Sequence, residues 1–201
     1  MNITPQWIKR ALDRGLLGSE SHKKMMPPYR KLHPSGTDKK KLKDSSVLLL
    51  LFQENGEIYT CLIKRPSTMK YHAGQVAFPG GKSEPGEKPL DTALRETWEE
   101  IGIHPDKIDV LGSLSEIFVE VSSFMIHPFV GWLTGKPTFT IHESEVEKII
   151  LFPLLKYKKA REFTDIETVS GKLTVPCFRF EGEMIWGATS MILSEFYDIL
   201  E

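Results

Sequence analysis

The sequence predicts an α/β domain, because strand-like and helix-like stretches follow one another along its 201 residues. Ser46 to Phe52 is a continuous apolar run of strand length, which is typical of a strand buried on both faces. Pro89 to Ile101 has the start and stop signals of a helix, and Ala188 to Leu200 has the pattern of an amphipathic closing helix. A chain of this length is expected to form one domain.

The N-terminal part is expected to be a helix and a basic linker over 1–44, ahead of the main domain over 45–201. Thr4-Pro5 predicts a helix start, with Thr4 as the N-cap. Residues 19–44 are polar, rich in lysine and broken by three prolines. Two interpretations stay open for this segment: a solvated linker, or a segment that wraps the domain or lends positive charge to an anionic substrate.

Composition excludes several classes of partner. A net charge of −1 gives no general attraction to nucleic acid or to an anionic membrane, so phosphate binding must come from local basic residues. No signal peptide is visible, and no apolar run is long enough to span a bilayer. Cys61 and Cys177 lie in apolar surroundings and are interpreted as free buried thiols. A cytoplasmic protein is therefore expected.

Several further elements are predicted along the chain. Asn55-Gly56 indicates a tight hairpin turn, after which Ile58 to Lys64 returns as a second strand. The remaining elements are a strand over 108–118 with a bend at Gly112, a strand over 124–133, a short helix over 154–163 and a strand hairpin over 164–180 that turns at Ser170-Gly171. His127, within the strand over 124–133, is interpreted as a satisfied core residue rather than a catalyst.

The helix over 89–101 carries the chemistry. Glu96, Glu99 and Glu100 are spaced i, i+3 and i+4, so their carboxylates share one face and repel one another. A divalent cation relieves that repulsion, and carboxylate oxygens suit Mg²⁺ or Mn²⁺. The opposite side of the helix is expected to be buried; it carries Leu94, Thr97, Trp98 and Ile101.

A longer pattern surrounds these acids. It consists of Gly81, five residues, Glu87, seven residues, Arg95-Glu96, two residues, Glu99-Glu100, one residue and Gly102. At average residue frequencies, a chance match in a chain of this length is on the order of one in a million. The pattern resembles the Nudix box, the signature of hydrolases that cleave nucleoside diphosphates linked to another group. Thr97 departs from it, because the family usually has a larger aliphatic residue there.

A second resemblance precedes the box. The spacing from Leu62 and Arg65 through Lys70 and Gly74 to the run Phe78-Pro79-Gly80-Gly81 resembles a motif of the coenzyme A diphosphatase branch of that family. Two positions depart: Lys70 stands where the branch usually has Arg, and Pro66 replaces a small residue. Lysine keeps the charge but loses the bidentate fork of arginine. The segments 121–131 and 185–189 also resemble that branch.

The resemblances imply the Nudix fold, a mixed β-sheet sandwiched between α-helices, and assign roles. Glu96, Glu99 and Glu100 would hold the divalent ion, with a carbonyl of Gly80 or Gly81 completing the coordination. Arg95 would lie beside the catalytic carboxylates, pair with Glu87 and fix the loop to the helix. Gly81 would also support the site without contacting the substrate. A loop glutamate would join the metal site or act as the general base, and Glu145 matches this role best, with Glu143 second. Glu96 is the other candidate for the general base. The expected substrate-binding positions are Arg65, Lys70, Gly74 and Phe78.

The predicted activity is metal-dependent hydrolysis of the coenzyme A diphosphate, giving 4′-phosphopantetheine and adenosine 3′,5′-bisphosphate. One alternative is a Nudix hydrolase of another nucleoside diphosphate derivative, such as ADP-ribose, NADH or a dinucleoside polyphosphate. A second is a non-catalytic ligand sensor, which the intact Arg95-Glu96 and Glu99-Glu100 pairs disfavour. The expected partner is a small molecule, and the protein would act as a monomer or homodimer.

Overall fold

The computed structural model describes residues 3–34, 42–69, 72–168 and 171–201. The helices are α1 (Pro5–Asp13), α2 (Ser19–Lys23), α3 (Pro89–Ile101) and α4 (Gly187–Ile199), with short 3₁₀ turns η2 (Pro105–Lys107) and η3 (Leu154–Tyr157). The strands are β1 (Lys43–Glu54), β2 (Glu57–Lys64), β3 (Val76–Ala77), β4 (Gly80–Lys82), β5 (Ile108–Ser113), β6 (Ile117–Val119), β7 (Phe124–Leu133), β8 (Lys148–Pro153), β9 (Glu162–Thr168), β10 (Gly171–Phe180) and β11 (Glu183–Trp186).

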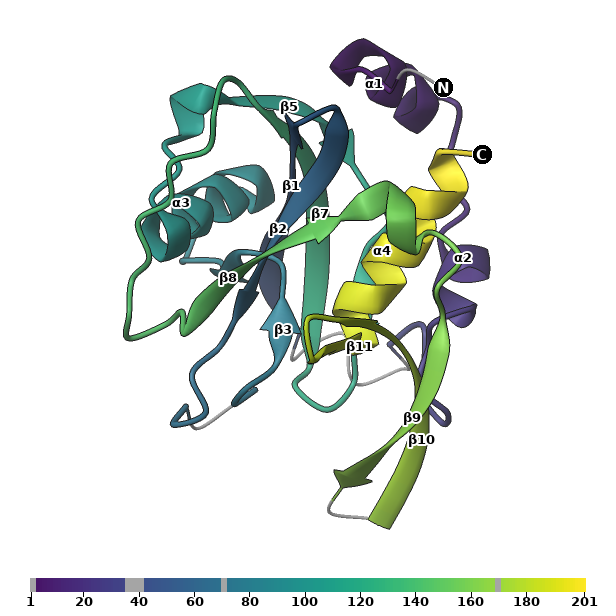
Figure 1. Cartoon of the computed structure of the whole chain (residues 1–201). Coiled ribbons are helices and arrows are strands. Elements are labelled where there is room, and N and C mark those ends of the chain that lie inside the picture. The colour runs from purple at the N-terminus through teal and green to yellow at the C-terminus, as the bar shows by residue number, and fades with distance from the viewer. Residues whose placement is uncertain (1–2, 35–41, 70–71, 169–170) are drawn as a thin grey trace.

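The main sheet is mixed. Its order is β3-β2-β1-β7-β5, and β4, β6 and β8 pair with β1, β7 and β2. The pairing of β1 with β7 is parallel, whereas β2 and β4 run antiparallel to β1. A separate sheet of β11, β10 and β9 follows, and its β9–β10 hairpin projects from the body of the molecule (Figure 1).

Strand β1 divides the core in two. Leu48 and Leu50 belong to the cluster on the α3 side, while Leu49 and Leu51 belong to the cluster that includes α4. Successive side chains of a strand point to opposite faces, so an all-apolar run fills both cores. The sheet therefore lies between α3 on one face and α4 on the other (Figure 1), which confirms the predicted α/β/α sandwich.

The β1–β2 turn follows its sequence signal. Asn55 and Gly56 both have positive φ, at 51° and 80°, and the flanking Glu54 and Glu57 are paired. Two positive φ angles define the type I′ turn, whose twist matches that of the strands it joins. This hairpin is confirmed, and it places the end of β2 beside the loop that leads to the box.

Three sequence expectations need correction. The strand expected over 108–118 is two strands, β5 and β6, because the pairing with β7 shifts at Gly112 and the chain leaves the sheet at 114–116. The helix expected over 154–163 is only the η3 turn, and β9 begins at Glu162. Trp98 is 51% exposed and meets His104 edge to face, so it does not help to bury α3.

The N-terminal segment packs on the domain in its described part. Helix α2 lies beside α4 (Figure 1), and Met25 is buried in the same cluster as residues of α4. Of the two interpretations for 19–44, the structure favours a wrapping segment for residues 19–34. The turn residue Ser170 and the lysines at 39–41 lie outside the described residues, and the division at residue 44 stays a prediction.

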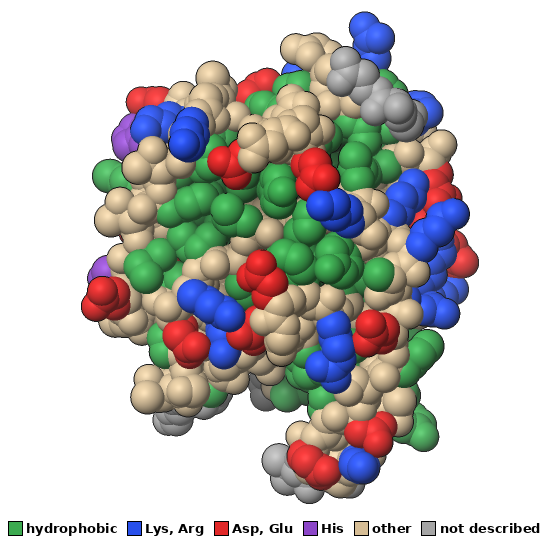
Figure 2. All heavy atoms as spheres, viewed as in Figure 1, with side chains coloured by type: hydrophobic (Ala, Val, Ile, Leu, Met, Phe, Trp, Pro, Cys, Tyr) green, Lys and Arg blue, Asp and Glu red, His purple; other side chains and the backbone are tan. Residues whose placement is uncertain are grey.

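The surface carries a broad hydrophobic area, and both thiols lie in the interior. Figure 2 shows an extended hydrophobic area on the face that carries α3 and β8, bordered by charged side chains of both signs. Cys61 and Cys177 are both free and buried. No helix among the described ranges combines the length and apolar composition needed to cross a membrane.

Candidate active site

Helix α3 is fixed at both ends and along one side. Pro89 opens its first turn, and Gly102 ends it at φ 75°, where the Gly102 amide donates to the carbonyl of Trp98 at 2.9 Å. Ala93 and Ile101 are buried in the core on this side of the sheet. The hydroxyl of Thr97 is also buried and donates to the carbonyl of Ala93 at 2.7 Å, so this departure from the family pattern changes packing within the helix.

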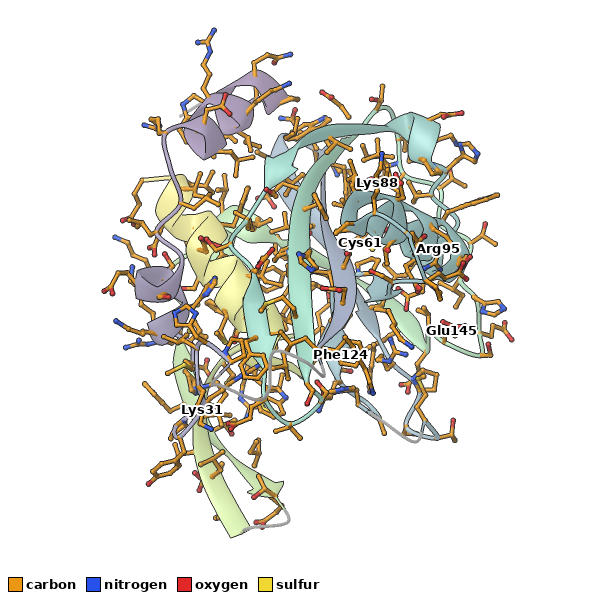
Figure 3. The ribbon with its side chains drawn as sticks, turned by 180° about the vertical axis from the view of Figure 1, so that it is seen from behind. Lys31, Cys61, Lys88, Arg95, Phe124 and Glu145 are labelled. Carbon is orange, nitrogen blue, oxygen red and sulfur yellow. The ribbon has the colours of Figure 1, made fainter. Side chains whose placement is uncertain are left out.

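Three carboxylates converge at the other side of α3. One oxygen from each of Glu96, Glu100 and Glu145 lies within 4.8 Å of the others. We call these residues the carboxylate cluster. Glu145 comes from the loop before β8, and this loop is tied to α3 because the amide of His142 donates to the carbonyl of Glu100 at 3.0 Å. Figure 3 shows Arg95 on α3 and Glu145 on its loop on the same side of the molecule.

The glycine pair lets the backbone of β4 lie against the cluster. The amide of Gly80 donates to Oε2 of Glu100 at 2.8 Å. A Cβ at Gly81 would clash with the carboxylate of Glu96, so only glycine fits there with the neighbouring groups in place. An amide of this pair thus orients a carboxylate, while the metal role that the resemblance implies for a carbonyl of Gly80 or Gly81 stays a prediction.

Arg95 joins the loop to the helix as predicted. Its Nε and Nη2 donate to the two oxygens of Glu87 at 2.8 and 3.0 Å, a bidentate pair. Its Nη1 donates to Glu96 at 2.8 Å and to Glu99 at 3.0 Å. Thr92 adds a hydrogen bond to Glu87 at 2.7 Å. Arg95 is the main cause that lowers the pKa of Glu87 to about 2.

The electrostatics of the cluster favour a cation. Burial raises the pKa of Glu100 to about 8, and the neighbouring carboxylates add to that rise. Burial also raises the pKa of Glu96, although Arg95 works against it. Three acids that face one another in a poorly solvated place gain charge stabilisation from a divalent ion. The donor set therefore fits Mg²⁺ or Mn²⁺, which prefer oxygen ligands.

Glu99 lies at the rim of this group. Its side chain is 53% exposed, and its carboxylate is held by Arg95 rather than by the cluster. The set brought together by the fold thus contains Glu145 in addition to Glu96 and Glu100. The role of Glu99 as a metal ligand stays a prediction.

The four expected substrate-binding residues differ in where the structure places them. Arg65 reaches the cluster, with Nη1 at 3.4 Å from Glu100, and its buried Nε has no hydrogen-bond partner among the described residues. Gly74 has φ 67° and closes the loop with a hydrogen bond to the carbonyl of Arg65 at 3.1 Å. Lys70 lies outside the described residues. The expectation for Phe78 is corrected, because its side chain is 2% exposed and packs in the core.

A cavity of about 400 Å³ adjoins the loop that carries Glu87. It is lined by Asp44, Lys82, Ser83, Glu84, Pro85, Gly86, Glu87, Pro89 and His127, and the carboxylate cluster is not part of its wall. His127 lies between two carboxylates, with Nε2 at 2.8 Å from Asp44 and Nδ1 at 3.0 Å from Glu116. His127 is therefore satisfied as expected, but its side chain is 16% exposed at the cavity wall and does not lie in the core.

No sequence pattern predicted the ion network beside the cluster. Lys64, which precedes Arg65, lies 3.2 Å from Glu183 and 3.2 Å from Glu147. Glu183 is far away in the chain and opens β11 directly after the turn at Glu181-Gly182, so no local pattern marks it. Only the pairing of β2 with β8, and the approach of β11, bring these charges together.

Comparisons with known proteins agree with this arrangement. A family model described as NUDIX domain matches residues 42–170. Nudix hydrolase 3 of Caenorhabditis elegans is 32% identical over 136 residues, which are 66% of this chain and 57% of that protein. The uncharacterized Nudix hydrolase NudL of Pectobacterium atrosepticum is 34% identical over 137 residues, which are 67% of this chain and 71% of that protein. The match spans just over half of the nematode protein.

A solved structure shows the same fold. The MutT/nudix family protein from Enterococcus faecalis superposes with a TM-score of 0.54 at 16% identity, covering 100% of this chain and 75% of that one. At this level of identity the likeness concerns the fold alone.

Proposed function

This chain belongs to the Nudix hydrolase family, and from that premise we propose that it hydrolyses the diphosphate of coenzyme A in a reaction that needs Mg²⁺ or Mn²⁺. The observation that carries the proposal is the convergence of Glu96, Glu100 and Glu145 within 4.8 Å. The products would be 4′-phosphopantetheine and adenosine 3′,5′-bisphosphate. The substrate is a small molecule, and the protein acts as a monomer or homodimer.

The cluster would hold the divalent ion, with Glu99 joining from the rim. When bound, such an ion neutralises diphosphate oxygens and makes a coordinated water more acidic. The residues supply the rest. Glu96 or Glu145 would take the proton of the attacking water, and both stand in the same cluster. Arg95 keeps Glu96 oriented through its bond of 2.8 Å, while its bidentate grip on Glu87 fixes the surrounding loop.

Arg65 supports the choice of a diphosphate substrate. Its guanidinium lies 3.4 Å from Glu100, which is long for a charge-assisted hydrogen bond, and no residue in the described part of the chain bonds its Nε. A cation with unused donors beside the carboxylates is suited to bind a phosphate oxygen. The coenzyme A assignment itself depends on the motif from Leu62 to Gly81, in which Lys70 and Pro66 depart from the usual residues.

A substrate panel tests this proposal. Purified protein with Mg²⁺ or Mn²⁺ would receive coenzyme A, its thioesters, ADP-ribose, NADH and dinucleoside polyphosphates, with the products identified by mass. We expect the highest kcat/KM for coenzyme A or a thioester. Turnover of another compound without cleavage of coenzyme A would favour the broader nucleoside diphosphate activity. Binding without turnover of any compound would favour a ligand sensor.

The location in the cell is also proposed. Both cysteines are free and buried, which suits a reducing compartment such as the cytoplasm. Fractionation of cells with an antibody against the protein would test this, and recovery in an organelle would contradict it.

A further inference from the structure

Two lysines face each other at the ends of β2 and β8. Lys64 closes β2, Lys148 opens β8, and the two are partners in the register of these strands. Like charges directly opposite on neighbouring strands destabilise the pairing. Glu183, the first residue of β11, accepts from both: its Oε1 lies 3.2 Å from Nζ of Lys64 and 2.8 Å from Nζ of Lys148. One carboxylate from the second sheet thus bridges the two lysines, and Glu147 adds a second negative charge beside Lys64.

The same strand ends lead directly into the candidate site. Arg65 follows Lys64 and reaches the carboxylate cluster. Glu145, a member of the cluster, lies three residues before Lys148. The two ends are also joined by Glu147, whose amide donates to the carbonyl of Lys64 at 2.8 Å. The separation of the two lysines is therefore set on the same strand ends that carry Arg65 and lead back to Glu145.

We propose that Glu183 is a positioning residue, which holds the ends of β2 and β8 together so that Arg65 and Glu145 converge on the cluster. The proposal rests on the proposed function, because it takes the cluster as a metal site. Lys148 first, and then Lys64, lower the pKa of Glu183, as expected for a carboxylate between two ammonium groups. Its side chain is only 16% exposed, so water screens these charges less than at an open surface.

The geometry makes the effect of a neutral side chain predictable. With glutamine at position 183, Lys64 keeps Glu147 at 3.2 Å, but the described residues give Lys148 no second carboxylate partner. The two ammonium groups then repel each other across the strand pair, and the loop that carries Glu145 moves away from α3. Removing the charge of Lys148 removes the cause of that repulsion.

The test compares the wild type with E183Q, with the double variant E183Q/K148Q and with E181Q. Glu181 is exposed in the turn just before β11 and makes no ion pair among the described residues. Its replacement by glutamine removes the same charge as E183Q. Mn²⁺ affinity is measured without substrate by electron paramagnetic resonance, and the Mn²⁺ concentration for half-maximal turnover is measured with substrate. We expect E183Q to weaken Mn²⁺ binding about tenfold, as groups behind metal ligands do. The Mn²⁺ affinity of E183Q/K148Q should return to within about twofold of the wild-type value. The affinity of E181Q should equal the wild-type value.

The outcomes separate the two proposals. Wild-type Mn²⁺ affinity in E183Q overturns the role of Glu183. Weak binding in E183Q that K148Q does not restore also overturns it, because Glu183 then acts through the packing of β11 and not through the lysine pair. A wild type that binds Mn²⁺ but cleaves no diphosphate overturns only the proposed function, since the Mn²⁺ comparison still decides the role of Glu183. A wild type that binds no Mn²⁺ overturns both.

Discussion

Two glutamates of this protein are almost completely buried, and their surroundings are opposite. Glu195 on α4 is 0% exposed and is surrounded by donors. The amides of Gly18 and Ser115 lie at 2.8 and 3.0 Å, the Ser115 hydroxyl at 2.6 Å and Nε2 of His22 at 3.2 Å. Burial works to raise the pKa of Glu195, but these hydrogen bonds outweigh it and the pKa is lowered.

Glu100 on α3 is 1% exposed and has few donors. The Gly80 amide bonds one oxygen, Arg65 is 3.4 Å from the other, and the remaining neighbours are Glu96 and Glu145. Burial raises its pKa to about 8. A buried carboxylate whose bonds are satisfied anchors structure, and Glu195 joins the N-terminal segment to α4 in this way. A buried carboxylate that faces other carboxylates marks a place for a cation.

The largest expected effect is on turnover in E100Q. Glutamine keeps the size of the side chain but removes the charge that holds the divalent ion. We expect kcat to fall about 1,000-fold, equivalent to about 4 kcal/mol of transition-state stabilisation. Steady-state assays on the best substrate measure this, with the exposed Glu84→Gln as a control of equal charge change. Turnover within a few-fold of the wild type would refute the metal role of Glu100.

The next effect is on stability in E195Q. The amide of glutamine cannot accept from the donors of Gly18, Ser115 and His22 together, so some stay buried without partners. We expect the free energy of unfolding to fall by about 2–3 kcal/mol, while kcat per folded molecule is unchanged. Urea denaturation measures this. Glu201→Gln, which removes an exposed pair with Lys158, should cost about 0.5 kcal/mol or less. Equal losses of unfolding free energy in E195Q and Glu201→Gln would show that the buried hydrogen bonds of Glu195 add no stability beyond that of a surface ion pair.

The third expected effect is the dependence of melting temperature on pH and metal. The Glu100 carboxyl has a folded pKa of about 8, above an unfolded value of about 4.3. Its contribution to stability is therefore present in acid and is lost as the pH rises through 8. In metal-free protein, the wild type should lose stability relative to E100Q between pH 5 and pH 9.

Metal should offset part of this loss. Mn²⁺ at about ten times its Kd contributes about 1.4 kcal/mol, which raises the wild-type Tm by about 3–6 °C. E100Q should respond much less, because one ligand is gone. Differential scanning fluorimetry in a chelator measures the pH dependence of Tm, and the same measurement in Mn²⁺ gives the rise in Tm. Parallel pH curves for the two proteins would show that Glu100 titrates normally.

The sequence by itself determined the elements whose causes are local. The all-apolar run of β1, the Asn55-Gly56 turn, and α3 between Pro89 and Gly102 each depend on a few neighbouring residues. The facing acids of α3 and the pairing of Arg95 with Glu87 also follow from spacing along one helix and its preceding loop. These signals were sufficient for the fold class and for half of the site.

Only the tertiary structure decided which groups from distant segments meet. It brought Glu145 to Glu96 and Glu100, left Glu99 at the rim, placed Phe78 in the core and set Glu183 between two lysines. It also surrounded Glu195 with hydrogen-bond donors and Glu100 with other carboxylates, although both are glutamates in helices of similar length. Burial and the number of donors around a carboxylate are set by strand register and packing, which no local pattern encodes.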